Sequence, residues 1–369
     1  MPRSLQPDRK LFGVTLALCL LGVVMVFSAS AMIASEQFGA GYIFLLRQLI
    51  YVVLGIAAMF WLMNRDYRKL RQPSVVFTGL GLTFVLLVCV FFLDRSHETH
   101  RWFRMGPFSF QPSEMAKLAL IVFLAWFLEL RRVPKGFGID DPLHTLLPAL
   151  GTTLLMAGLV VKEPDMGTAF MILLISIVML FVAGLSFRYI AGTLLAAIPT
   201  IYLLIVRVPY RLQRFEAFLH PELDPKGAGF QLLQSLIAVG SGGMTGVGLM
   251  ESHQKLFFLP EAHTDFIYAI IGEEFGFIGG VIVLALFAVY GWRGFVAAMK
   301  ARDEFGKFLA LGITTMVVGQ ALINLSVVLG LMPTKGIPLP FISYGGSSLF
   351  AMLLATGVLL NISQHADEA

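Results

Sequence analysis

The amino-acid sequence predicts an all-α integral membrane protein with about ten transmembrane helices in a single polytopic domain, residues 1–369. Hydrophobic residues make up 57% of the chain and charged residues only 14%, whereas a soluble domain carries about 25% charged residues. The mean hydropathy is +0.81. Apolar runs long enough to cross, or nearly cross, a bilayer recur ten times. These runs are too long and too continuous for the strands of a membrane barrel, so we expect helices.

The predicted spans follow one another along the chain, and the longest polar stretch comes before the eighth of them. Glycine and proline interrupt several spans, which membrane helices tolerate because neighbouring groups satisfy the freed backbone. In order, the spans are Leu11–Ile33, Phe44–Met63, Val75–Leu93, Met115–Leu130, Leu143–Val161, Gly167–Phe187, Tyr189–Val206, Phe275–Met299, Phe308–Leu331 and Ser347–Ile362.

Basic residues indicate how the chain is oriented in the membrane. Lys and Arg cluster before the first span and between spans two and three, four and five, and eight and nine. These segments alternate as they should if all are cytoplasmic, because Lys and Arg are retained on that side. Both termini are then cytoplasmic, and one large extracytoplasmic loop, residues 207–264, lies between spans seven and eight. The net charge of +4 therefore reflects topology and not nucleic-acid binding.

The most informative polar stretch runs from Leu259 to Phe266, directly before a span. It contains two carboxylates and His263. A carboxylate held where a membrane helix meets a wet loop is costly to place, which makes it a functional candidate. We expect Asp265 to be the catalytic base of a membrane enzyme. The alternative is that these charges only cap a helix at the interface.

The long loop carries further candidate segments. Arg211 and Arg214 are three residues apart and share one face if the segment is helical, and arginine is the preferred residue for binding phosphates. A turn at residues 224–225 then leads into a helix near Gln231. The glycine-rich stretch 240–248 lacks the Gly-Lys-Ser/Thr ending of a nucleotide-binding loop, so we expect a bend beside a lipid substrate instead.

The second outer loop supplies an aromatic residue and several charges. Trp102, next to Arg101, is either an anchor at the membrane interface or a platform for a sugar. Glu114 and Lys117 are three residues apart, so they share a helix face and can form an ion pair. Because Lys117 lies within an apolar run, it should face the bundle or a wet cavity. A functional role for this pair and a purely structural one both stay open.

Three more polar features lie in the remaining segments. Residues 163–165, Glu-Pro-Asp, are explained by a turn with a helix cap. The segment 333–348, which contains Lys335 and Ser343, has three prolines that fix an extended path. Such irregular backbone is tolerated at membrane depth only where it is buried in protein or lines a cavity. Asn324, inside a span, is expected to hydrogen-bond to a neighbouring helix.

Most of these polar residues fall on the same predicted side of the membrane. Arginines, a lysine, aromatic residues and one carboxylate suit a substrate with a lipid tail, a phosphate-rich head and a group to be deprotonated. Glycosyl transfer from a lipid diphosphate fits this set, because the acceptor hydroxyl needs one general base. The leaving diphosphate departs as an anion and needs cations. Glycoside hydrolysis, by contrast, usually needs a pair of carboxylates across the bond.

Several ordered motifs together resemble one family over nearly the whole chain. They are Arg101-Trp102 and residues 110–117, 164–168, 210–214, 224–231, 259–266 and 342–347. The chain resembles the SEDS family of bacterial membrane proteins (shape, elongation, division and sporulation). The resemblance implies a peptidoglycan glycosyltransferase that polymerises lipid II at the outer face of the cytoplasmic (inner) membrane.

The resemblance also implies roles for individual residues. The family's essential aspartate matches Asp265. Its loop tryptophan and basic residue match Trp102 and Arg101, and its Glu–Lys pair matches Glu114 and Lys117. Together with the predictions made from the chemistry of the residues, the resemblance gives a set of expected substrate-binding residues: Arg101, Trp102, Glu114, Lys117, Arg211, Arg214, Gln231, His263, Lys335 and Ser343.

The resemblance further implies partners and a branch of the family. Members work with a class B penicillin-binding protein, which supplies transpeptidation, and with other divisome or elongasome membrane proteins. The motifs favour the FtsW-like division branch over the RodA-like elongation branch. Two alternatives from other classes are a lipid II flippase and a division scaffold without catalysis.

A metal requirement stays open on the sequence alone. Magnesium or manganese could assist the diphosphate chemistry, but no dedicated ligand cluster is visible and no other cofactor is evident. Cys19 and Cys89 lie inside apolar runs and have neither metal-site spacing nor a setting for a disulfide, so we expect core residues.

Overall fold

A computed structural model describes residues 7–93, 100–105, 108–132, 138–225, 227 and 229–366. A few side chains within these ranges are not described, and that of Arg211 is one of them. The expectation for Arg211 therefore lies outside the described side chains.

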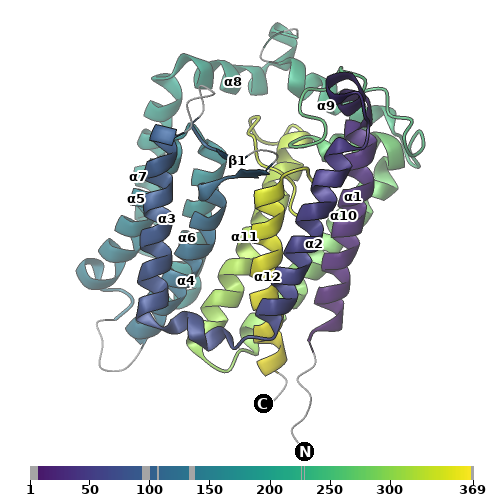
Figure 1. The fold of residues 1–369 in the computed structure, drawn as a ribbon. Coiled ribbons are helices and arrows are strands. Elements are labelled where there is room, and N and C mark those ends of the chain that lie inside the picture. Colours follow the sequence, from purple (N-terminus) through teal and green to yellow (C-terminus); the bar gives the residue numbers. More distant parts are fainter. Residues whose placement is uncertain are drawn as a thin grey trace, which may run out of the picture.

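The described chain is almost entirely helical, as the sequence predicts (Figure 1). The only strands described form a small antiparallel hairpin, β1 (Phe103–Met105) and β2 (Phe108–Phe110). The helices are α1 (Arg9–Phe38), α2 (Ile43–Met63), α3 (Pro73–Leu93), α4 (Pro112–Arg132), α5 (Leu147–Lys162), α6 (Met166–Ala183), α7 (Phe187–Val206), α8 (Pro209–Leu219), α9 (Phe230–Ser241), α10 (Ile267–Met299), α11 (Glu304–Val328) and α12 (Gly346–Ala366), with short turns η1 (Tyr67–Arg71), η2 (Pro142–Leu146) and η3 (Pro221–Leu223).

Each predicted apolar run coincides with one of these helices. In the described part of the chain, eight helices are long and apolar enough to cross a membrane, namely α1, α2, α3, α5 with η2, α6, α10, α11 and α12. The other two predicted spans correspond to α4 and α7. The chain is thus a multi-pass helical membrane protein.

Helices α11 and α12 form the centre of the bundle. Inside the molecule, 78% and 89% of their apolar windows are buried, compared with 22% for α3 and α10. In lipid, helices associate through close packing, which small residues permit. A Cβ atom added at Gly357 of α12 would stand 2.6 Å from the Met59 carbonyl oxygen of α2, so glycine lets these two helices touch.

The segment before the eighth predicted span is more structured than a loop. Helix α8 lies across one end of the bundle and α9 follows it (Figure 1). Residues 243–248 then insert beside α10, which is broken at Gly276 with φ 65° and ψ −161°. The Phe277 and Ile278 amides donate to the carbonyls of Gly243 and Met244, and the carbonyls of residues 273 and 274 accept from residues 247 and 248. We call residues 243–248 the wedge.

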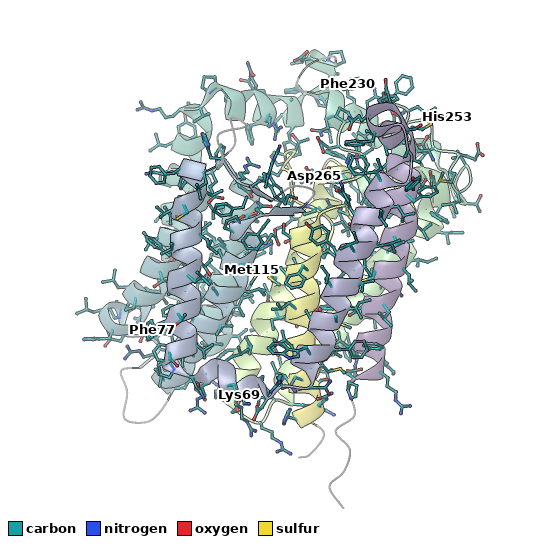
Figure 2. All side chains as sticks on the ribbon, in the orientation of Figure 1. Lys69, Phe77, Met115, Phe230, His253 and Asp265 are labelled. Atoms are coloured by element: carbon teal, nitrogen blue, oxygen red, sulfur yellow. The ribbon has the colours of Figure 1, made fainter. Side chains whose placement is uncertain are left out.

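The opposite end of the bundle carries paired charges and both ends of the described chain (Figure 1). The Asp8 amide donates to Ser363 Oγ at 3.4 Å, which ties the start of α1 to the end of α12. Lys69 lies at this end and Asp265 at the other (Figure 2). The ion pairs here include Arg68–Asp303, Arg71–Glu129, Arg132–Glu304 and Arg293–Asp8.

Candidate active site

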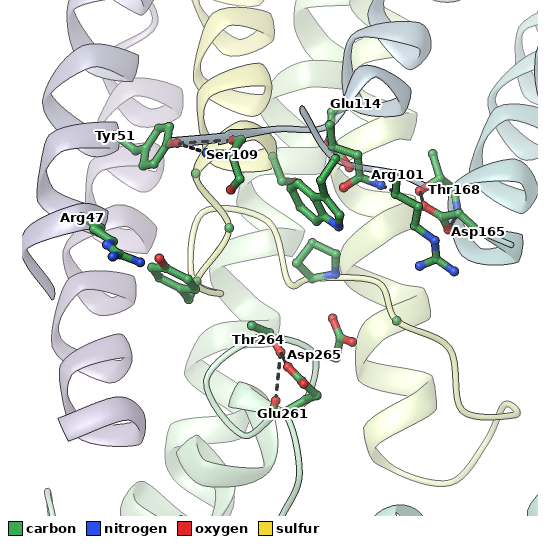
Figure 3. Close-up of a pocket in the computed structure, with 18 of the residues that line it drawn as sticks. Arg47, Tyr51, Arg101, Ser109, Glu114, Asp165, Thr168, Glu261, Thr264 and Asp265 are labelled. Atoms are coloured by element: carbon green, nitrogen blue, oxygen red, sulfur yellow. Dashed lines mark hydrogen bonds between the residues drawn. The ribbon is translucent and has the colours of Figure 1, made fainter. Parts of the chain in front are cut away.

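A pocket of about 450 Å³ opens at the end of the bundle where Asp265 lies (Figures 2 and 3). Segments far apart in the sequence meet there: α2, the β-hairpin, the starts of α4, α6 and α12, and the loops before α10 and α12. The polar and charged side chains in its wall are Arg47, Tyr51, Arg101, Arg104, Ser109, Gln111, Glu114, Asp165, Thr168, Glu261, Thr264, Asp265, Tyr344 and Ser348.

Four helices begin at or beside this pocket. Residues of the first turns of α4, α6 and α12 line it, and Asp265 is two residues before the start of α10. The backbone amides at a helix start are partly positive and have no partner in their own helix. Their convergence favours an anionic ligand such as a phosphate.

Asp265 combines access to the pocket with a perturbed acidity. Burial, followed by the negative charges of Glu261 and Asp165, raises the pKa of its carboxyl, and Arg101 and Arg214 lower it; the net result is a pKa of about 7. A carboxylate whose pKa lies near neutral pH is suited to accept a proton as a general base. The positive charges of Arg101 and Arg214 favour the ionised form, which is the form that accepts a proton.

The backbone of Gly336 closely approaches this carboxylate. A Cβ atom added at Gly336 would stand 3.0 Å from Asp265 Oδ2. The last loop therefore forms part of the wall against which the carboxylate rests, and a larger residue at this position would displace it.

Arginines approach the pocket from more than one side. Arg47 of α2 lies at one side with Tyr51, and Arg101 lies at the other with Asp165 and Thr168 (Figure 3). Arg101 Nε donates to the Glu163 carbonyl at 2.6 Å, and its Nη2 donates to the Pro164 carbonyl. Arg101 thereby holds the hairpin segment against the start of α6.

Asp165 fulfils its predicted role as a helix cap. Its Oδ1 accepts from the Thr168 amide at 2.9 Å, and its Oδ2 accepts from Thr168 Oγ1 and from Gln111 Nε2. The same carboxylate also lines the pocket, which the sequence did not indicate. Next to it, Glu163 is fully buried, and burial, followed by the charge of Asp165, raises the pKa of Glu163 to about 8.

The predicted ion pair between Glu114 and Lys117 is confirmed. The two groups lie 3.0 Å apart. Glu114 lines the pocket, whereas Lys117 does not. Lys117 is 1% exposed, and its Nζ also donates to Gln320 Oε1 at 2.7 Å.

The remaining predicted binding residues lie around the pocket rather than in its wall, and contact with a substrate stays a prediction for each. Gln231 Nε2 donates to the Pro260 carbonyl. The His263 ring lies 5.0 Å from that of Phe44 and 5.7 Å from that of Tyr344, and burial lowers the pKa of its imidazole.

The other three predicted residues also have contacts near the pocket. Lys335 Nζ lies 4.8 Å above the Phe170 ring. Ser343 Oγ donates to the Thr264 carbonyl. The positive charge of Arg214, on α8, lowers the pKa of Asp265.

Some residues of the pocket were not predicted from the sequence. Arg47 lies near the start of an apolar run and was counted as part of a span. Its one visible signal is that it is a charge inside that run, where charges usually face a cavity or a partner. Tyr51 hydroxyl and the Ser109 backbone lie 3.3 Å apart, a contact between α2 and the hairpin that nothing in the sequence indicates.

No metal-binding cluster is found among the described residues. None of them form a group of three or more His, Cys, Asp or Glu side chains that could hold an ion. The metal requirement remains a prediction.

Comparison with known proteins identifies the family. Residues 9–368 match the model of the FtsW, RodA and SpoVE family, described as cell cycle proteins. The chain belongs to this family. A probable peptidoglycan glycosyltransferase FtsW from Trichlorobacter lovleyi is 42% identical over 367 residues, covering 98% of this chain and 94% of that protein.

Two further FtsW/RodA/SpoVE comparisons point the same way. The stage V sporulation protein E of Bacillus subtilis is 43% identical over 365 residues, 99% of each chain. A solved chain described under "Structural coordination of polymerization and crosslinking by a peptidoglycan synthase complex" superposes with a TM-score of 0.79 at 31% identity, covering 99% of this chain and 100% of that one. The resemblance stated from the motifs is thus confirmed for sequence and fold.

Proposed function

We propose that this chain is a peptidoglycan glycosyltransferase that polymerises lipid II during cell division. The relatives of the FtsW/RodA/SpoVE family supply the reaction class, since the T. lovleyi relative is named for it. The observation in the structure that carries the proposal is Asp265: a carboxylate with a pKa of about 7, in a pocket with three arginines in its wall.

The proposed chemistry uses one base and several positive groups. Asp265 takes the proton from the acceptor sugar hydroxyl, whose oxygen attacks the donor carbon that carries the diphosphate. The new carbon–oxygen bond forms as the bond to the diphosphate breaks, and the diphosphate leaves as an anion. Asp265 then releases the proton to solvent. Because the leaving group is already anionic, it needs positive charge and no proton donor.

The cationic candidates divide according to their position. Arg47 and Arg104 join Arg101 in the pocket wall as candidates for direct contact with the diphosphate, since arginine binds phosphate oxygens through two parallel hydrogen bonds. Arg214 and Arg211, on α8, are proposed to attract the anionic head group toward the site. Trp102, also in the wall, is proposed as the platform for a sugar ring.

In the proposed topology, the pocket lies at the outer face of the inner membrane. Ten helices would cross the membrane, with residues 207–264 as the large extracytoplasmic loop of a single polytopic domain in the bacterial inner membrane. The side of the bundle where both ends of the described chain lie also carries Arg68, Arg71 and Arg132. That side is proposed to be cytoplasmic, because basic residues are retained there.

The proposed partner is a class B penicillin-binding protein, which would crosslink the strands made here. The superposed relative comes from a peptidoglycan synthase complex, which supports a partnered enzyme. Other divisome membrane proteins complete the proposed assembly. If magnesium or manganese takes part, the diphosphate of the substrate itself would be its main ligand, because the described residues offer no cluster for it.

The test is glycan-strand formation from labelled lipid II. The chain is co-purified with its penicillin-binding partner carrying an inactivated transpeptidase, and is compared with the Asp265→Ala variant. We expect polymer from the first and none from the second, because the variant lacks the carboxylate that is proposed to take the proton from the acceptor hydroxyl. The matched control is Glu251→Gln, an exposed carboxylate in the same long loop, which should polymerise normally.

Two outcomes would contradict the proposal. Polymer from a folded Asp265→Ala variant would remove Asp265 as the base. No polymer from the unmodified complex, together with transfer of labelled lipid II between the leaflets of vesicles, would favour the flippase alternative.

A further inference from the structure

Two side-chain amides of α11 hold the backbone around Asp265. Asn324 Nδ2 donates to the carbonyl of Asp265 at 2.7 Å and to the carbonyl of Ile337 at 2.8 Å. Gln320 Nε2 donates to the carbonyl of Pro338 at 2.9 Å. Gln320 and Asn324 are four residues apart, so they lie on one face of α11, one turn from each other. The sequence-based expectation that Asn324 bonds to another helix is therefore wrong: it bonds to two loops.

The orientation of Gln320 follows from the chemistry of its neighbours. Lys117 can only donate hydrogen bonds, so the atom that faces its Nζ must be the amide oxygen. The NH₂ group then faces the Pro338 carbonyl, which can only accept. Lys117 thus fixes which way the amide of Gln320 points, and Glu114 in turn holds Lys117.

The side chains of Gln320 and Asn324 make these hydrogen bonds inside the protein, where they are shielded from water. Gln320 is 0% exposed and Asn324 is 2% exposed. A hydrogen bond in such surroundings is strong, and a carbonyl left without its donor is costly. The contacts therefore favour a single position for the backbone they hold.

The backbone that they hold is the part that shapes the pocket. Asn324 bonds directly to Asp265, and the segment 336–338, held at residues 337 and 338, includes Gly336 beside the Asp265 carboxylate and Pro338 in the pocket wall. Ser343 adds a further contact, since its Oγ donates to the Thr264 carbonyl and accepts from the Leu339 amide. Both loops are thereby joined to each other and to α11.

We propose that Gln320 and Asn324 are positioning residues for Asp265, and that the Glu114–Lys117 pair acts on catalysis by orienting Gln320. This inference rests on the proposed glycosyltransferase function. It gives Lys117 a role other than binding the diphosphate, in keeping with its place behind the pocket wall. The chemical requirement is a donor at both positions, because both partners are carbonyl oxygens.

The test separates positioning from substrate binding and from folding. Gln320→Glu keeps an acceptor for Lys117 but cannot donate to Pro338 when ionised, and Asn324→Leu removes both donations while keeping a side chain that branches at Cγ. A misplacement of about 1 Å can cost about 100-fold in rate. We therefore expect kcat for lipid II polymerisation to fall by about 10- to 100-fold in each variant, with KM within about twofold of the unmodified complex.

The matched control is Thr314→Val on the same helix. Thr314 is also buried, but its hydroxyl bonds only to the Ala310 carbonyl of α11 itself. Its kcat should equal that of the unmodified complex. A Gln320→His variant, whose ring can both accept from Lys117 and donate to Pro338, should recover part of the lost kcat.

The measured kcat and KM distinguish a positioning role from direct contact with the substrate. A folded Gln320→Glu variant with unchanged kcat would overturn the inference, and so would a rise in KM at constant kcat, which would indicate a substrate contact. Should Asn324→Leu fail to fold, Gln320→Glu alone decides. Polymerisation by Asp265→Ala in the same assay would instead refute the proposed function, so the two failures are distinguishable.

Discussion

Two buried lysine–glutamate pairs in this protein have the same chemistry but different surroundings. Lys117 and Glu114 lie 3.0 Å apart with side chains 1% and 3% exposed, and Lys255 and Glu274 lie 2.7 Å apart with side chains 5% and 0% exposed. The first pair touches the pocket and is connected through Gln320 to the loop that contains Pro338, beside Asp265. In the second pair, both side chains bond to Ser28 of α1.

The difference shows that equal burial does not imply an equal role. The Lys255–Glu274 pair joins α1, α10 and the long loop beside the wedge, and neither residue lines the pocket. Its effect should therefore be confined to stability. The Lys117–Glu114 pair should affect both stability and rate, because its hydrogen bonds continue to the carbonyls near Asp265.

Removal of either lysine alone should have the largest effect, and it should be similar for both pairs. Lys117→Met or Lys255→Met leaves a buried carboxylate without its cation, which costs about 3–5 kcal/mol. Thermal unfolding in detergent should show a large loss of stability in both variants. Normal stability in either one would mean that water reaches the remaining carboxylate.

Replacing both charged residues of a pair by neutral ones should then show the difference between the two pairs in polymerisation activity. Replacing a buried ion pair by groups of similar volume is often neutral for stability, so Lys117→Met/Glu114→Gln and Lys255→Met/Glu274→Gln should both regain much of it. Polymerisation should return only in the second, with kcat of the first still lower by about tenfold or more because Gln320 has lost its partner. Equal kcat in the two double variants would show that the Lys117–Glu114 pair affects catalysis no more than the Lys255–Glu274 pair does.

Glu163 extends the comparison to a buried carboxyl without a lysine. Its pKa is about 8, raised above the ordinary value of 4.5, so the folded state binds a proton more tightly than the unfolded state. Stability from this group is fully present below about pH 4.5 and is lost as pH rises toward 8, at about 1.4 kcal/mol per pH unit. Glu163→Gln should remove this dependence, which melting curves between pH 5 and 8 can measure.

The smallest expected effect concerns Glu261, beside Asp265, the proposed catalytic base. Its charge raises the pKa of Asp265, and Glu261→Gln keeps an acceptor for Thr264 Oγ1, which donates at 2.7 Å. The pKa of Asp265 should fall, so the acid limb of the pH dependence of kcat should move to lower pH. A shift to higher pH would show that Glu261 acts by something other than its charge.

Local patterns in the sequence were enough to predict much of this structure. The apolar runs predicted the helices, and the spacing of Glu114 and Lys117 predicted their ion pair, because both signals are contained in a few consecutive residues. Asp265 was singled out for the same reason: a carboxylate directly before an apolar run is visible without any tertiary information.

The missed features all depend on contacts between distant segments. Lys255 and Glu274 are 19 residues apart and meet because the chain turns back in the loop that leads into α10. Arg47 enters the pocket because α2 packs beside α12, and the β-hairpin forms from only three residues in each strand. Asn324 bonds to loops and not to a helix. This could not be predicted because tertiary packing determines where those loops lie.

The wedge at the break in α10 limits how the length of this chain can change during evolution. Four backbone hydrogen bonds cross between residues 243–248 and residues 273–278, and a Cβ at Gly246 would stand 2.1 Å from the Glu274 carbonyl oxygen. An insertion or deletion here would break several of these hydrogen bonds and leave backbone polar groups at the break in α10 without partners. Variation in length should therefore be rare in the wedge, although it lies in a connecting segment, where insertions are ordinarily tolerated best.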